Sequence, residues 1–192
     1  MEVVVGIEVL PATFTYGEGA RIVGERGVRA LLDSGAIERL GRGLYRKAGV
    51  LGDEELAQIA LRAPLGTVCL VSALSHHELT DEIPREWDVA IPRGSWAPVM
   101  DVAVSWHRFD AATFDVGRGE LALSDGSRIG IYSPERSLVD AYRLRYALGG
   151  DVAVEALRRW LRGGGQPSRL LEVAQLFPRA MAPIRQALEI LL

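Results

Sequence analysis

Apolar and polar positions alternate at helical spacing in the first quarter of the chain, and this pattern predicts its first elements. Over residues 26–33, three apolar side chains share one helical face: Val28, Leu31 and Leu32. The opposite face carries the basic residues Arg26 and Arg29. A helix of this kind is expected to pack on a core through one side and to present two guanidinium groups on the other.

The segments on either side of this helix complete a small unit. Thr15 is suited to cap a short helix over residues 16–22, and residues 23–24 are expected to form a turn. After Gly35, residues 37–40 and 44–46 are strand-like and flank a tight turn over residues 41–43, with Arg42 at its tip. The order helix, turn, helix and hairpin predicts a winged helix-turn-helix. Residues 1–10 fit either a strand or a first helix.

The remainder of the chain predicts a second, mixed domain. A helix is expected over residues 53–63, and residues 67–79 fit a helix, with a short strand over residues 68–71 as the alternative. The expected strands are residues 87–91, 102–107, 113–116, 120–123 and 128–132. The expected helices are one from Ser133 onward, with a buried stripe of Leu138, Val139, Tyr142 and Tyr146, and those over residues 151–162, 167–176 and 179–192.

The expected fold class is therefore α+β. A winged helix-turn-helix domain over residues 1–49 is expected to be joined by a small, glycine-bearing hinge at residues 48–52 to a C-terminal domain over residues 53–192. In that domain, a small sheet over about residues 86–132 precedes a helical bundle over about residues 134–192.

Composition limits the class of protein. The chain has 192 residues, of which 48% are hydrophobic, so it can bury a core. Its net charge is −3, whereas residues 15–47 hold seven basic and four acidic side chains. The apolar surroundings of Cys69, the single cysteine, predict a buried thiol. Without a leader-like start or an apolar run of spanning length, a cytoplasmic location is expected.

A local excess of arginine beside a hairpin favours nucleic-acid binding. A recognition helix enters the major groove, where arginine reads guanine edges, and an arginine on a wing reaches phosphate or the minor groove. The predicted DNA-binding residues are Arg21, Arg26, Arg29, Arg39, Arg42, Arg46 and Lys47.

Motifs for catalysis are incomplete. The neighbours His76 and His77 do not share a helical face, so they make a poor metal site. Glu86, Asp88 and Asp101 resemble only part of the carboxylate set of a metal-dependent nuclease. We therefore expect no enzyme, no metal and no cofactor. A degenerate nuclease and a protein-interaction module remain the alternatives to DNA binding.

Three stretches together resemble the AbiEi-type antitoxins of type IV toxin–antitoxin systems, which are linked to abortive infection of phage-infected bacteria. They are ERLGRGLYRKAG (residues 38–49), TVCLVSALSHHELTDEIPREWDVAIPRG (residues 67–94) and YSPERSLVDAYRLRYALGGDVAVEALRRWL (residues 132–161). The resemblance extends from about residue 13 to the end of the chain.

This resemblance implies a transcriptional autorepressor that binds double-stranded DNA at inverted repeats in its own promoter. It also implies a C-terminal domain that counters a nucleotidyltransferase-like toxin without forming a stable complex with it. The DNA-contact role implied by the resemblance falls on Arg26 and Arg29 in the helix and on Arg42 at the wing tip. The other four basic residues are candidates for phosphate contacts.

Overall fold

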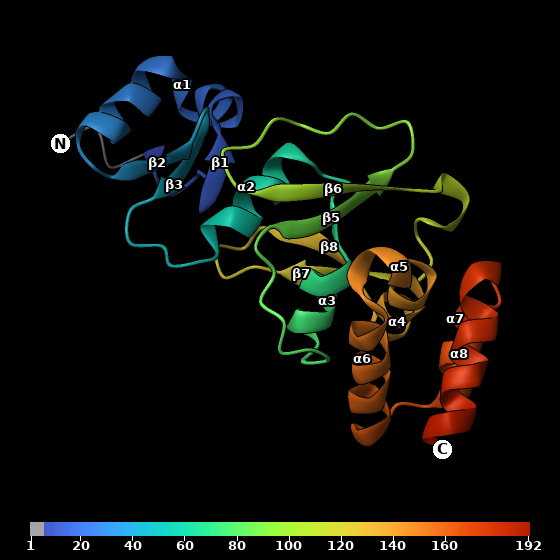
Figure 1. The fold of residues 1–192 in the computed structure, drawn as a ribbon. Coiled ribbons are helices and arrows are strands. Elements are labelled where there is room, and N and C mark those ends of the chain that lie inside the picture. Colours follow the sequence, from blue (N-terminus) through green and yellow to red (C-terminus); the bar gives the residue numbers. More distant parts are fainter. Residues whose placement is uncertain (1–5) are drawn as a thin grey trace. The chain divides into compact units, whose positions relative to one another are not determined.

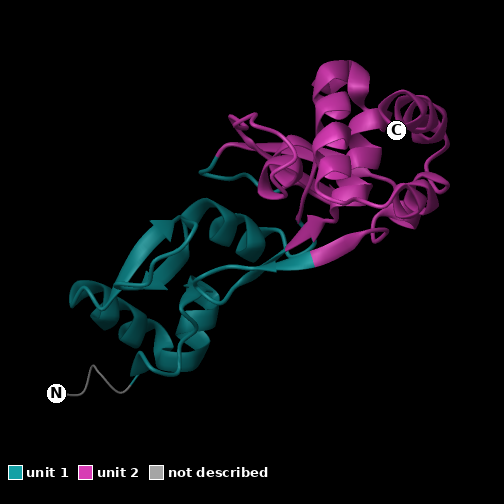
Figure 2. Cartoon of the chain, turned by 90° about the horizontal axis from the view of Figure 1, so that it is seen from below, with its two compact units in different colours: residues 1–66, 98–102, 120–129 teal, residues 67–97, 103–119, 130–192 magenta. Residues whose placement is uncertain are grey.

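The computed structural model of the protein describes residues 6–192 and divides the chain into two compact units (Figure 2). Unit 1 comprises residues 1–66, 98–102 and 120–129, and unit 2 comprises residues 67–97, 103–119 and 130–192. The boundary expected at residues 48–52 divides a DNA-binding domain from a C-terminal domain of different function, and this division stays a prediction. Of the segment 1–10, for which a strand or a helix was expected, residues 1–5 lie outside the described residues, and a turn over residues 6–9 leads into buried Leu10.

Unit 1 begins with a helix that is broken by a glycine. Helix α1 spans Tyr16–Asp33, but Gly24 has φ 76° and ψ 159°, so two helical segments meet there (Figure 1). The Thr15 side chain accepts a hydrogen bond from the backbone N–H of Glu18 at 3.2 Å, and the Glu18 carboxylate accepts one from the N–H of Thr15 at 2.8 Å. These reciprocal bonds satisfy N–H groups that a helix start leaves open. The predicted cap is confirmed, and in place of the turn expected over residues 23–24 the helix has a kink at Gly24 alone.

A small antiparallel sheet packs beside α1. Its strands are β1 (Thr13–Thr15), β2 (Ile37–Gly41) and β3 (Leu44–Lys47), in the order β1–β3–β2. The β2–β3 hairpin was predicted, whereas β1 was not. One buried cluster joins these elements and comprises Leu10, Phe14, Val28, Leu31 and Ile37.

Helix α2 (Glu54–Arg62) is the second helix of unit 1. Its N-cap is Asp53, whose side chain accepts a hydrogen bond from the backbone N–H of Leu56 at 3.1 Å. It packs against β1 and β2 and buries Leu56 and Ile59. The predicted helix is confirmed, and its partner is the small sheet.

A mixed five-stranded sheet has the order β6–β5–β4–β8–β7. Strand β4 pairs antiparallel with β5 and parallel with β8, whereas β5 and β6 are parallel to each other. Residues 120–129, around the turn between β7 and β8, are grouped with unit 1. The strand bounds are Thr67–Val68 (β4), Trp87–Pro92 (β5), Val104–Phe109 (β6), Arg118–Ala122 (β7) and Arg128–Tyr132 (β8).

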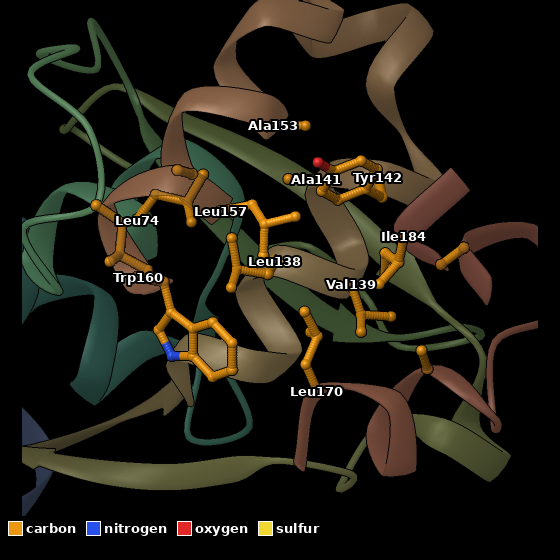
Figure 3. Close-up of a cluster of buried hydrophobic side chains, with 14 of the residues drawn as sticks. Leu74, Leu138, Val139, Ala141, Tyr142, Ala153, Leu157, Trp160, Leu170 and Ile184 are labelled. Atoms are coloured by element: carbon orange, nitrogen blue, oxygen red, sulfur yellow. The ribbon is translucent and has the colours of Figure 1, made fainter. Parts of the chain in front are cut away.

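The helices of unit 2 pack around α4. Its apolar side chains Leu138 and Val139 meet Leu157 from α6 and Ile184 from α8 in one buried cluster (Figure 3). The helices are α3 (Leu70–His76), the 3₁₀ turn η2 (Ala111–Thr113), α4 (Pro134–Arg143), α5 (Arg145–Leu148), α6 (Gly150–Arg162), α7 (Pro167–Ala174) and α8 (Pro178–Leu191). None of the helices within residues 6–192 has the length and apolarity needed to cross a bilayer.

Three local predictions are wrong. Leu32, which the helical spacing places with Val28 and Leu31 on the packing face, is 38% exposed, and only the other two are buried. Residues 113–116 do not form a strand, because Asp110 caps η2 by accepting a hydrogen bond from the backbone N–H of Ala112 at 3.0 Å. Tyr146 is 90% exposed instead of buried, because α4 ends at Arg143 and the new helix that starts at Arg145 has a different phase. For the segment after residue 67, both alternatives hold in part, since a two-residue strand is followed by α3.

A fully buried arginine fixes α4 to its surroundings. Arg136 donates from Nε to the Asp140 carboxylate at 2.9 Å and from Nη1 to the carbonyl oxygens of Thr113 and Val116 at 2.7 and 2.6 Å. Its guanidinium carbon also lies 4.2 Å from the centre of the Tyr132 ring. Burial raises the pKa of Asp140, although the positive charges of Arg136 and Arg143 oppose this increase.

Candidate nucleic-acid interface

The second segment of α1, over residues 25–33, presents basic side chains on its exposed face. Arg26 and Arg29 are exposed and form no ion pair with any residue in the described part of the chain. Val28 and Leu31 are each 2% exposed and lie in the cluster that contains Ile37 of β2. Because one face of the segment is buried against the hairpin strand, the opposite face and its guanidinium groups are left exposed.

The β2–β3 hairpin places Arg42 at its tip, as predicted. The turn uses Gly43 at φ 70°, a left-handed conformation that favours glycine. The pairing of the two strands shifts between Arg39 and Gly41. Arg39 is exposed, and its Nε donates to the carbonyl oxygen of Gly41 at 3.0 Å. The hairpin therefore carries two exposed arginines, at its tip and on β2.

Helix α2 supports the hairpin along its length through one face. Glu54, Gln58 and Arg62 are spaced by four residues, so they lie on the same side of the helix. Gln58 is 5% exposed, and its side-chain amide donates to the carbonyl oxygen of Leu40 at 3.2 Å. Arg62 donates to the carbonyl oxygen of Arg42. The wing is thus held by a helix that the sequence pattern had placed in the other domain.

Arg46 belongs to this support and is not available as a surface charge. It is 8% exposed, and its Nη2 lies 2.5 Å from the Glu38 carboxylate and 2.7 Å from the Glu54 carboxylate. Burial opposes its charged form, but the hydrogen bonds and negative charges of both glutamates outweigh burial and raise the pKa of Arg46. This arginine therefore joins β2, β3 and α2.

The remaining predicted contact residues are peripheral. Arg21 is exposed on the first segment of α1, and Lys47 is half-buried at the end of β3. The backbone N–H of Lys47 donates to the carbonyl oxygen of Ala12 at 2.8 Å, which fixes the end of the strand. Asp101 accepts a hydrogen bond from the backbone N–H of Arg42 at 3.2 Å, so a carboxylate lies next to the wing tip.

The acidic residues considered for a nuclease site have other partners. Asp88 lies 2.8 Å from Nε2 of His107, Asp101 binds the hairpin turn, and Glu86 is exposed. Within residues 6–192, no three histidine, cysteine or acidic residues form a group that can hold a metal ion. Nothing in this arrangement favours the nuclease alternative.

The histidine pair and the cysteine have structural surroundings. The rings of His76 and His77 lie 5.3 Å apart, and Nε2 of His77 lies 2.7 Å from the carbonyl oxygen of Tyr132. Burial, followed by the charge of His77, lowers the pKa of His76. Cys69 is fully buried, as predicted, and burial raises the pKa of its thiol well above the usual value.

Sequence reasoning missed the residues that hold the wing in place. The four-residue spacing of Glu54, Gln58 and Arg62 indicates only that they share one side of a helix. This spacing does not identify their hydrogen-bond partners, which lie 8 to 20 residues away in the sequence. The sequence indicates Asp101 only as a candidate metal ligand. The structure places it beside the hairpin turn instead.

Comparison with known proteins gives a fold and no family. No protein-family model matches the chain, and no curated protein matches it. The crystal structure of the Rv2827c protein from Mycobacterium tuberculosis is similar, with a TM-score of 0.53 and 17% sequence identity, over 93% of this chain and 76% of that chain. At this identity the similarity concerns the fold alone.

Proposed function

We propose that the chain binds double-stranded DNA in a sequence-directed manner through a winged helix-turn-helix in unit 1. The observation that carries this proposal is the pairing of two elements on one core. The segment over residues 25–33 exposes Arg26 and Arg29, and the hairpin packed against it exposes Arg42 at its tip. A helix with outward guanidinium groups fits the major groove, and a thin hairpin beside it fits the adjacent backbone or minor groove.

The contact residues take different roles in this proposal. Arg26 and Arg29 read base edges, because they project from the helix that enters the groove. Arg21, Arg39, Arg42 and Lys47 neutralise phosphates and set the position of the protein on the duplex. Arg46 does not touch DNA, since two carboxylates already hold it.

We further propose that the protein is an AbiEi-type antitoxin and transcriptional autorepressor. It binds inverted repeats in its own promoter, and its C-terminal domain, over residues 53–192, counters a nucleotidyltransferase-like toxin without a stable complex and without enzymatic activity. The support is the order of the three stretches that resemble this family, residues 38–49, 67–94 and 132–161, which fall in both compact units.

The proposal is tested by titrating the protein against the DNA upstream of its own gene and against a scrambled duplex, at two salt concentrations. We expect tight, salt-sensitive binding with preference for the native sequence. Arg29→Ala is expected to weaken specific binding by ~1–3 kcal/mol and to relax base preference. Arg162→Ala is the matched control, because Arg162 is exposed in unit 2.

Two results would contradict the assignment. Equal affinity for the native and scrambled duplexes at both salt concentrations would leave no sequence-directed reading. Retained affinity in both Arg26→Ala and Arg29→Ala would show that the helix does not enter the groove. Co-purification of a neighbouring gene product without DNA binding would favour the protein-interaction alternative instead.

A further inference from the structure

A second group of arginines surrounds a cleft in unit 2 that the proposed function does not use. The cleft has a volume of about 810 Å³. Arg93 enters it from the segment after β5, Arg108 from β6, Arg143 from the end of α4 and Arg179 from the first turn of α8. Four basic side chains from four different elements thus line one hollow.

The topology of the sheet explains why these residues meet. Strands β5 and β6 are parallel, with Pro92 opposite Phe109, so their carboxyl ends lie at the same edge. The backbone N–H of Arg93 donates to the carbonyl oxygen of Phe109 at 2.7 Å, which fixes the segment that follows β5. In open sheets that contain parallel strands, ligands bind outside the carboxyl ends.

Most of this positive charge has no ion-pair partner among the residues that the structure describes. Arg93, Arg108 and Arg179 are exposed and form no ion pair with any residue between positions 6 and 192. Arg143 differs, because its Nη2 lies 2.9 Å from the Asp140 carboxylate and its guanidinium carbon lies 4.6 Å from the centre of the Phe109 ring.

The other ionisable side chains of the cleft do not neutralise the three free arginines. His107 lies 2.8 Å from the Asp88 carboxylate. Asp110 also lines the cleft, and its carboxylate accepts the backbone N–H of Ala112 at 3.0 Å. Three unpaired guanidinium groups therefore face one acid, and this excess of positive charge fits an anion with several negative charges.

We propose that this cleft binds a nucleotide that carries at least two phosphate groups. Guanidinium groups bind phosphate oxygens in pairs of parallel hydrogen bonds, and several of them suit a polyphosphate better than a single carboxylate. Trp106 also lines the cleft and offers an aromatic surface for a base. The volume lies within the roughly 300–1,000 Å³ that is usual for sites of small ligands and cofactors.

The test is calorimetric titration of the full chain with ADP and, separately, with inorganic pyrophosphate. ADP is expected to bind more tightly than pyrophosphate, because both carry two phosphates and only ADP has a base. Arg108→Ala and Arg179→Ala are each expected to lower ADP affinity tenfold or more. Arg185→Ala is the control, since Arg185 is exposed on the same helix as Arg179 but does not line the cleft.

Several results would overturn the proposal. The first is that folded protein gives no heat of binding with ADP. The second is that both arginine variants keep the wild-type affinity for ADP, and the third is that the protein binds ADP and pyrophosphate with equal affinity. Arginine-dependent binding of a single-stranded oligonucleotide without ADP binding would assign the cleft to nucleic acid instead. Circular dichroism of each variant checks folding. Arg26→Ala is expected to keep ADP affinity, so the result does not depend on whether unit 1 binds DNA.

Discussion

At the residue scale, burial separates two uses of arginine in this chain. Arg46 and Arg136 are buried and bound by carboxylates, whereas Arg26 and Arg29 are exposed and free of ion pairs with described residues. In the sequence, Arg46 next to Lys47 has the same appearance as a phosphate-binding residue. Its partner Glu54 lies eight residues away on another element, and this distant contact decides its role.

The buried pair gives a prediction on stability. Arg136→Met is expected to destabilise the protein by about 3–5 kcal/mol, because it leaves the Asp140 carboxylate buried without its main partner. Urea unfolding measures the change, with Arg185→Ala as an exposed control that keeps the wild-type midpoint. Replacing Asp140 with Leu in the Arg136→Met background is expected to restore part of the stability. A wild-type midpoint for Arg136→Met alone would contradict this account.

Asp125 gives a prediction on pH. Burial opposes the ionised form of Asp125, but hydrogen bonds from Ser127 and Thr13 outweigh it and lower its pKa. A lowered folded-state pKa contributes stability above the unfolded-state pKa of about 3.9, and this contribution disappears as the pH falls through the folded-state value. Asp125→Asn is therefore expected to be less stable than wild type at pH 7, and the difference is expected to shrink below about pH 4. Urea midpoints between pH 7 and 3 test this, and a constant difference would contradict it.

At the element scale, a single backbone position decides how α1 presents its second segment. The φ and ψ of Gly24 lie in a region that is essentially closed to other residues, although no atom lies within 4 Å of an added Cβ. The constraint is therefore conformational and not steric. Without this break, residues 25–33 would continue the direction of the first segment and would no longer pack on Ile37.

Two glycines of α1 test this point against each other. Gly24→Ala is expected to destabilise the protein by roughly 1–3 kcal/mol, because alanine does not tolerate this backbone conformation. Gly17→Ala is expected to stabilise it by up to about 1 kcal/mol, because Gly17 lies in the regular first turn with open space around it. The thermal unfolding temperatures of both variants, compared with that of wild type, test these two expectations. An unfolding temperature for Gly24→Ala at or above that of wild type would show that this position is not strained for alanine.

The elements that the sequence predicted are those with local signals. The Thr15 cap, the Gly24 break and the Arg42 turn each depend on neighbours within three or four residues. Strand β1 escaped prediction because it has three residues, and its pairing with β3 joins positions about 30 residues apart. The support of the wing by α2 and the arginine-lined cleft depend on side chains that are distant in the sequence, so no periodicity indicated them.

At the scale of the whole molecule, the net charge is negative, but one segment near the N-terminus is positively charged. The chain carries a net charge of −3, yet residues 15–47 hold an excess of basic over acidic side chains. Because the residues outside this segment carry a net negative charge, the affinity for DNA depends on the few phosphates that the basic segment neutralises. The proposed DNA binding is therefore expected to be sequence-specific, with a salt sensitivity that is set by these few phosphate contacts.

This distribution separates the phosphate-binding residues from the base-reading ones. A plot of log affinity against log salt concentration has a negative slope. For each phosphate that a variant no longer neutralises, this slope is expected to become less steep by about 0.9 per bound chain. Lys47→Ala is expected to show this smaller slope with unchanged preference for the native operator over a scrambled duplex. Arg29→Ala is expected to lose the preference instead, because base contacts carry the sequence information. Fluorescence anisotropy at several salt concentrations measures both quantities. An unchanged slope for Lys47→Ala would show that this residue does not contact DNA phosphates. An unchanged preference for the native operator in Arg29→Ala would show that the helix does not enter the groove.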